Sequence, residues 1–181
     1  MKETWEHFNE EGTPDECLGP PQQYSIELIP KFVMAQDNMV KMILHTNVSK
    51  YLEWKCIEGI YTIKDSTIKK VPTTNKEASS FMGWFERRRF RDLLSFAKAY
   101  DASDPKSPPG TSPGASTGQL LASYSLSESV AGVVGTSMAL YSHATWPQEP
   151  SGKTLERLAR FFSALCYYNQ KSPYIYPMGG L

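Results

Sequence analysis

Two absences limit what kind of protein this sequence encodes. No apolar run reaches the length that a bilayer-spanning helix needs, and the N-terminal stretch MKETWEHFNEEG is acidic, unlike a signal or transit peptide. The three cysteines, Cys17, Cys56 and Cys166, are odd in number and widely spaced, without a C-x-x-C pair, which argues against a disulfide framework. These features predict a cytoplasmic protein in a reducing compartment.

The chain also has no excess of charge of either sign. Its 19 Lys and Arg residues balance 19 Asp and Glu residues, so no overall field attracts nucleic acid or anionic lipid. Any basic surface must therefore be local, and no nucleic-acid partner is expected.

Motifs for catalysis or cofactor binding are absent as well. The SGKT stretch at 151–154 resembles the end of a phosphate-binding loop, but Pro147 stands where that motif needs glycine. The GTSMA stretch at 135–139 has Ala139 where a nucleophile elbow needs its second glycine. The histidines share no metal-ligand spacing with each other or with the cysteines. The sequence therefore predicts neither an enzyme nor a cofactor or metal site.

Strand and helix patterns alternate in about the first 75 residues. The helix at 38–52 has a candidate cap in Asp37 or Asn38, and β-branched residues lie on both sides of the turn-forming KDS, before Pro72. The elements expected here are a short helix around residues 5–8, an extended segment at 24–34, a helix at 38–52 and a β-hairpin.

After residue 75 the strand pattern ends and helical spacing takes over. Helices are expected at about 76–100, 117–124, 127–142 and 152–169, with a Pro/Gly/Ser-rich loop between the first two. The chain thus has an α+β fold class, in which a partial α/β part with a hairpin precedes an all-helical part.

Four arginines crowd the segment FMGWFERRRFRDLL at 81–94. Helical projection places Arg87, Arg91 and Lys98 opposite a broad apolar face, which is typical of a core helix with a solvated side. Glu86 and Arg89 project into the apolar face, which indicates the rim of a groove or a bond to a neighbouring helix. The apolar face contains Phe85, Phe90, Leu93, Leu94, Phe96, Ala97 and Tyr100.

Small residues interleave with valines in the stretch 127–142, SESVAGVVGTSMALYS. Glycine inside a helix lowers its stability, so Gly132 and Gly135 need a packing or functional reason. Close contact between helices and a slot for a slender apolar ligand both fit this pattern, and both interpretations stay open.

Taken in order, several segments resemble the Rab GDP-dissociation inhibitors, in the family that also contains the Rab escort proteins. The matching stretches run collinearly from about Trp5 to Leu181, and the FERRR core and the SPYxYP element are more similar to the inhibitors than to the escort proteins. The family's N-terminal Gly-rich turn and its C-terminal part have no counterpart in this chain. The segments are IELIPKFVMA, VKMILHTNVSKYLEWK, IKKVPTTNKEA, SSFMGWFERRRFRDLL, GTSMALY and KSPYIYPMGGL.

This resemblance implies a domain organisation and a function. Residues 1–80 would be part of a large flavoprotein-like domain that binds no flavin, 81–172 a small helical domain that shelters geranylgeranyl groups, and 173–181 the start of a return to the large domain. The implied partners are GDP-bound, geranylgeranylated Rab GTPases, which the protein keeps or extracts from membranes during transient membrane contact, without catalysis or a cofactor. The alternatives are an escort-like chaperone for Rab prenylation and a truncated family member without function.

The resemblance also implies site residues on two surfaces. The residues expected to contact the prenyl group are Phe85, Leu93, Ala97, Val130, Val134 and Met138. Those expected to contact the Rab partner, chiefly its C-terminal tail, are Met42, Leu44, Val48 and Tyr51, with Arg89 as a further contact.

Overall fold

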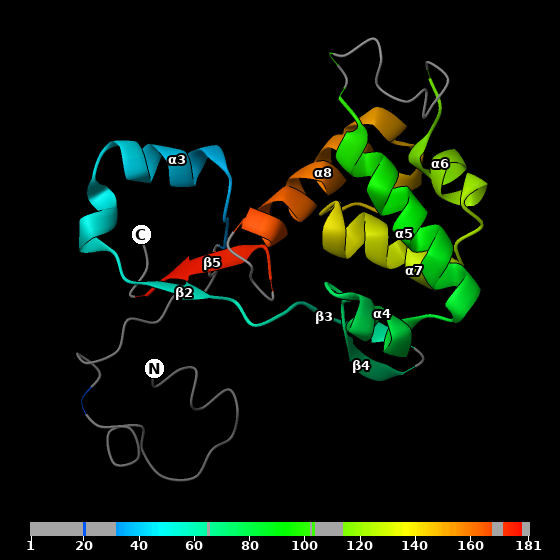
Figure 1. Cartoon of the computed structure of the whole chain (residues 1–181), viewed down its shortest axis with the longest axis horizontal. Helices are drawn as coiled ribbons and strands as arrows, with labels where there is room; N and C mark the ends of the chain where they lie inside the picture. The colour runs from blue at the N-terminus through cyan, green and yellow to red at the C-terminus, as the bar shows by residue number, and fades with distance from the viewer. Residues whose placement is uncertain are drawn as a thin grey trace.

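The computed structural model describes Pro20 and residues 32–64, 66–101, 103, 114–167 and 172–178. Figure 1 shows a small sheet at one end and a group of helices at the other, with the long helix α8 (Ser151–Tyr167) reaching from the helices toward the sheet. The short helix expected around residues 5–8 lies outside the described residues, as does most of the extended segment expected at 24–34.

A three-stranded antiparallel sheet joins distant parts of the sequence. Its strand order is β1 (Val33–Met34), β5 (Tyr174–Pro177), β2 (Trp54–Cys56). Val33 and Cys56 both lie opposite Ile175, so the last strand is inserted between the two earlier ones. Within the described residues, the chain therefore returns after α8 to the place where β1 lies.

Helix α3 (Asn38–His45) is shorter than the sequence predicts. Asp37 caps it, as expected, because its carboxylate accepts a hydrogen bond of 2.7 Å from the backbone N–H of Asn38. The prediction of one helix over 38–52 is wrong, because Asn47 takes a left-handed conformation with φ 58° and ends the α-helix. A separate 3₁₀ turn, η2 (Val48–Tyr51), follows.

The predicted β-hairpin is confirmed. Strands β3 (Tyr61–Lys64) and β4 (Thr67–Lys70) pair antiparallel with Ile63 opposite Ile68, and Ser66 in the turn has a positive φ of 59°. The short helix α4 (Asn75–Phe81) follows, and Thr74 and Glu77 form a capping box at its start.

The helical part contains α5 (Trp84–Ala99), α6 (Thr117–Ser123), α7 (Glu128–Val133), the π-helical turn η3 (Val134–Met138), the short 3₁₀ turn η4 (Trp146–Gln148) and α8. The single helix expected at 76–100 is wrong in one respect, because extended backbone at Met82 and Gly83 separates α4 from α5. Strands and helices together confirm the α+β class.

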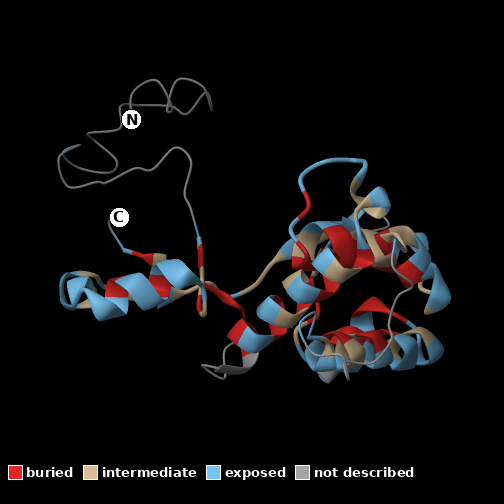
Figure 2. Cartoon of the chain, turned by 90° about the horizontal axis from the view of Figure 1, so that it is seen from above, coloured by how far each residue is buried: buried red, intermediate tan, exposed pale blue. Residues whose placement is uncertain are grey.

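Helices α5 and α6 and the turn η3 all pack against α8. Their buried side chains form one cluster, which Val71, Phe81 and Met82 join from the hairpin and α4. Figure 2 shows these buried residues on the sides of the helices that face one another. The core of the described chain thus lies in the helical part.

A neighbouring indole ring leaves no room for a side chain at Gly135. A methyl group at Gly135 would lie 2.7 Å from atoms of the Trp146 ring, whereas at Gly132 it would meet nothing within 4 Å. Trp146 in turn stacks on Tyr141 with ring centroids 6.2 Å apart. This contact favours close packing as the reason for the glycine at 135.

The two glycines give a matched pair of substitutions. Gly135→Ala is expected to lower the free energy of unfolding by about 1–3 kcal/mol, because the methyl group displaces Trp146. Gly132→Ala is expected to raise it by about 0.5–1 kcal/mol, because alanine favours the helix and finds open space. Urea denaturation of both variants measures the difference, and equal effects at the two positions would contradict this packing.

Glu77 gives the hairpin and α4 a pH-dependent link. Its carboxylate accepts hydrogen bonds from Lys70 Nζ at 2.7 Å and from the backbone N–H and hydroxyl of Thr73 at 3.0 and 2.9 Å. Partial burial raises the pKa of Glu77, but these partners outweigh it and lower the pKa to about 2.

Because the folded state lowers this pKa, the stabilisation is present above pH 4.5 and is lost as the pH falls toward 2. Glu77→Gln is therefore expected to cost about 1–2 kcal/mol at neutral pH and little at pH 2. Glu58→Gln, at an exposed position, is the control and should change stability by less than about 0.5 kcal/mol. An equal loss of stability for Glu77→Gln at both pH values would contradict the assignment.

Candidate functional site

Five of the six residues predicted to contact a prenyl group lie together in the helical core. Each of them is at most 1% exposed, and α5, α7 and η3 bring them into the same buried cluster. A cluster buried to this degree has no preformed slot that opens to solvent. The five residues are Leu93, Ala97, Val130, Val134 and Met138.

Helix α8 supplies a wall of this cluster that the sequence-based site prediction omitted. Leu155, Leu158 and Phe161 are all 0% exposed, and Phe162 and Leu165 lie beside them. The signal was present in the sequence, because these positions recur at helical spacing. Any apolar ligand entering the cluster would have to contact α8.

Phe85 lies apart from the other five residues. Its side chain is 72% exposed and packs edge-to-face on Trp84, with ring centroids 4.9 Å apart. The helical projection was too coarse here, because Phe85 is in the first turn of α5, about 140° around the axis from buried Phe90. The expected apolar face is real for Phe90, Leu93 and Ala97, but it does not include Phe85.

Glu86 holds a neighbouring helix, one of the two roles expected for it. Its Oε1 accepts a hydrogen bond of 2.8 Å from the backbone N–H of Ser127, which caps α7. A carboxylate at a helix N-terminus also compensates the helix dipole. Arg89 is exposed on α5 and does not share this contact.

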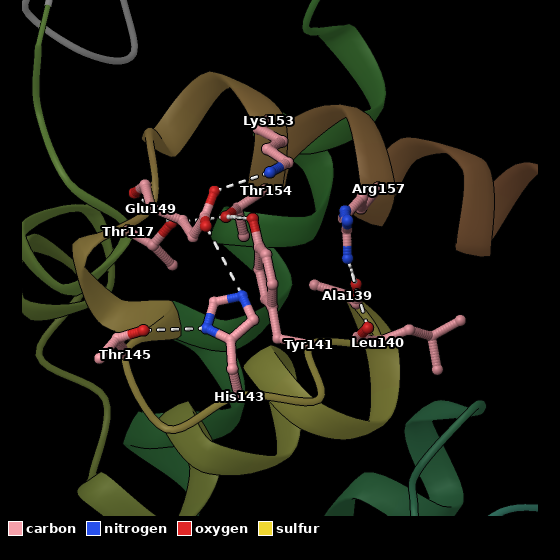
Figure 3. A network of polar contacts seen from close by, with 10 residues as sticks. All are labelled: Thr117, Ala139, Leu140, Tyr141, His143, Thr145, Glu149, Lys153, Thr154 and Arg157. Atoms are coloured by element: carbon pink, nitrogen blue, oxygen red, sulfur yellow. Dashed lines mark hydrogen bonds and ion pairs between the residues drawn. The ribbon is translucent and has the colours of Figure 1, made fainter.

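A polar network closes the side of the cluster where η3 ends (Figure 3). The hydroxyl groups of Tyr141 and Thr154 lie 2.9 Å apart, and Thr154 also contacts the hydroxyl of Thr117. Thr117 donates to the backbone carbonyl of Glu149 at 2.9 Å. Thr117 and Thr154 are fully buried, so their mutual hydrogen bonds compensate for lost hydration.

Arg157 fixes the end of η3 from α8. Its Nη1 donates to the carbonyl oxygens of Ala139 and Leu140 at 2.8 and 3.3 Å, and its guanidinium lies 4.4 Å from the centroid of the Tyr141 ring. Leu140 has a positive φ of 56°, a conformation that leucine rarely adopts. The chain reverses sharply here, and Arg157 stabilises the reversal.

Charged groups on the surface complete the network in Figure 3. Lys153 Nζ bonds Glu149 Oε2 at 2.7 Å, and His143 Nε2 lies 3.5 Å from Glu149 Oε1. The hydrogen bond from Lys153 lowers the pKa of Glu149, and His143 adds to the effect. These contacts join α8 to the segment that contains η4.

A cleft of about 570 Å³ separates the start of α3 from η3 and α8. Its basic side chains are Lys41, Arg157 and Arg160, and Asp37 is its acidic one. Met138 belongs to both this cleft and the buried cluster, so it forms the boundary between them. The other lining residues are Met34, Gln36, Asn38, Ala139, Leu140, Ala159 and Ser163.

The residues predicted to bind the Rab tail are all exposed, but they do not form one face. Met42 and Leu44 on α3 are 55% and 54% exposed and point about 160° apart around the helix. They emerge on either side of Lys41, which faces the cleft. Val48 and Tyr51, 42% and 87% exposed, belong to η2 beyond the helix break. Arg89 lies on α5, which Figure 1 shows at the opposite end of the structure.

No group of three or more histidine, cysteine, aspartate or glutamate side chains that could hold a metal occurs among the described residues. In the same part of the chain no helix has the length and apolar character that would let it cross a bilayer.

Comparison with known proteins places these features in a family. The sequence profile of the GDP dissociation inhibitors matches residues 1–181. The chain is 34% identical to a guanosine nucleotide diphosphate dissociation inhibitor of Arabidopsis thaliana and 36% identical to the Rab GDP dissociation inhibitor beta of the dog, Canis lupus familiaris. Each alignment covers 100% of this chain and 41% of the relative, so the chain spans well under half of their length.

A crystal structure of a Rab GDI from Plasmodium falciparum is also similar. The superposition covers 95% of this chain and 41% of that one, with 28% sequence identity and a TM-score of 0.75. Both the sheet and the helical part therefore have counterparts in a solved member of the family. The chain belongs to the GDP dissociation inhibitor family.

Proposed function

We propose that this chain binds prenylated Rab GTPases in the GDP-bound state and shelters the geranylgeranyl group within the cluster between α5, α7, η3 and α8. The observation that supports this most is the convergence of five expected prenyl contacts on one apolar cluster. The proposal includes no catalysis and no cofactor, and it places the protein in the cytoplasm with transient membrane contact. Residues 81–172 would form the sheltering domain.

The shelter would be closed until lipid arrives. Because the five expected contact residues are at most 1% exposed, lipid can reach them only when the helices around them separate. A geranylgeranyl chain gains about 0.8 kcal/mol for each buried methylene group, which offsets the free-energy cost of separating the helices. Lipid would then take the place of the neighbouring helix, so the same side chains stay out of water in both states.

The cleft offers a route from the partner's tail to the cluster. A tail held beside α3 would cross the cleft, and the lipid at its end would enter where Met138 separates cleft from core. Arg160 and Lys41 line this route and can bond backbone carbonyls or acidic groups of the tail. Among the exposed apolar residues near it, Met42 follows Lys41 directly and Leu44 lies three residues after it, and Val48 and Tyr51 would extend the contact.

Filling the cluster tests the proposal. Val134→Leu adds one methylene group at a fully buried position, and Val134→Trp replaces the isopropyl group with a much larger indole side chain. Both are expected to reduce the release of a GDP-loaded, geranylgeranylated Rab from liposomes, Val134→Leu by about threefold and Val134→Trp by at least tenfold, because overpacking competes with lipid. Cosedimentation with fluorescent Rab measures release.

Ile68→Trp is the matched control, since it enlarges an apolar side chain that is 77% exposed on the hairpin, outside the cluster. Circular dichroism melts first establish that each variant is folded. If folded Val134→Leu and Val134→Trp both release Rab as well as the parent chain does, the lipid does not bind in this cluster.

A further inference from the structure

The outward side of α5 carries an aromatic pair that the sheltering function leaves unused. Trp84 and Phe85 are 60% and 72% exposed, and their rings meet at an interplanar angle of 84°. Burying two such rings would release a large apolar area from water. Exposed aromatic side chains that lie side by side indicate a contact surface.

Arginines surround this pair on the same side of the helix. Arg88 lies four residues after Trp84 and three after Phe85, and Arg91 follows three residues later, so that all four occupy neighbouring positions on the helix surface. Arg88 and Arg91 are exposed, and neither forms an ion pair with any residue that the structure describes. We call Trp84, Phe85, Arg88 and Arg91 the outer face of α5.

The nearby acidic groups offset only part of the positive charge of this face. Glu86 is directed toward α7, where it bonds the N–H of Ser127. Asp92 is exposed four residues after Arg88, so it lies on the same side of α5 and offsets one positive charge there. It also adds to the burial effect that raises the pKa of Tyr124, the residue after α6. Arg89 adds a further exposed positive charge beside Phe85. In a chain with no net charge, this is a local basic surface.

The outer face lies on the opposite side of α5 from its buried side chains. Phe90, Leu93 and Ala97 lie between about 180° and 240° around the axis from Trp84, toward the cluster. A single helix thus presents the prenyl wall inward and the aromatic and basic side chains outward. Contact through the outer face would leave the wall of the shelter intact.

We propose that the outer face of α5 docks on the surface of an anionic phospholipid bilayer. Trp84 and Phe85 would enter the interfacial region, where aromatic rings are favoured, and Arg88 and Arg91 would bond lipid phosphates and carboxylates. The arginines, which form no ion pair among the described residues, complement the negative charge of lipid headgroups, and the exposed rings suit the bilayer interface. This combination favours a bilayer as the binding partner of the outer face. This docking rests on the proposed function and extends it, because it would place the prenyl shelter at the membrane from which the lipid anchor is extracted.

Vesicle binding by the chain alone tests the docking without any Rab. The probes are phosphatidylcholine vesicles with and without phosphatidylserine, and cosedimentation measures the bound fraction. We expect binding to the anionic vesicles that weakens as salt rises, with Trp84→Ala/Phe85→Ala and Arg88→Gln/Arg91→Gln each reducing the partition constant about tenfold.

Two matched control variants distinguish binding through the outer face from a general effect of removing apolar side chains or positive charges. Ile63→Ala/Ile68→Ala removes two aliphatic side chains that are each 77% exposed on the hairpin, and Lys55→Gln/Lys76→Gln removes two exposed charges elsewhere. Both controls should bind as the parent chain does. Absence of binding to anionic vesicles, or an equal reduction of binding for the controls and the outer-face variants, would overturn the proposal, as would binding to an acidic protein surface in preference to vesicles.

Failure of vesicle docking can be distinguished from failure of prenyl sheltering. Uptake of a geranylgeranylated peptide from solution depends on the buried cluster and needs no bilayer. The outer-face variants should retain that uptake while losing vesicle binding, whereas Val134→Trp should lose uptake and retain vesicle binding.

Discussion

The structure depends on the burial of one face of α8. Leu155, Leu158 and Phe161 on this face are wholly excluded from water, and α5, α6 and η3 cover them from different sides. Phe161 also meets Tyr174 of β5 edge-to-face, with ring centroids 6.5 Å apart. The same helix face therefore organises the helical core and connects it to the sheet.

A sheltering site made from a core has a built-in conflict between stability and function. The side chains that would receive the lipid are the ones that stabilise the empty protein, and close packing of helices excludes a preformed cavity. The chain offers features suited to limited opening around this cluster. Gly135 accepts Trp146 in place of a side chain, η3 departs from α-helical geometry, and Arg157 holds the carbonyl groups at its end. π-Helical turns of this kind are frequent at functional sites.

Much of the fold follows from local patterns in the sequence. Alternation around KDS gave the hairpin, Asp37 was a correct cap, and helical spacing located the four helical regions. The helix expected at 127–142 was too long, because helical geometry ends at Met138, before Leu140 with its positive φ. The remainder depended on contacts between distant residues. The pairing of Ile175 with both Val33 and Cys56 joins strands from the two ends of the described chain, which no local pattern encodes.

The candidate site likewise combines features that the sequence predicts with features that depend on the three-dimensional structure. Periodicity placed Leu93 and Ala97 on an apolar face, the family resemblance added Val130, Val134 and Met138, and the structure brings the five together. It could not show that Phe85 in the first turn of α5 extends beyond the neighbouring helices, or that Asn47 interrupts the surface expected for a Rab tail. The exposure of Phe85 depends on where the neighbouring elements end, and the break after α3 depends on the left-handed Asn47. The family resemblance alone predicts neither feature.

The most direct test of the central claim is to map where the lipid lies. A geranylgeranylated C-terminal Rab peptide with a photoreactive group at the end of its lipid chain would be cross-linked to the protein, and the modified residues identified by mass spectrometry. We expect labels within the buried cluster, on α5, η3 and α8 residues such as Leu93, Val134 and Leu158. Labels confined to exposed positions, such as Trp84 and Phe85, with none in the cluster, would contradict it.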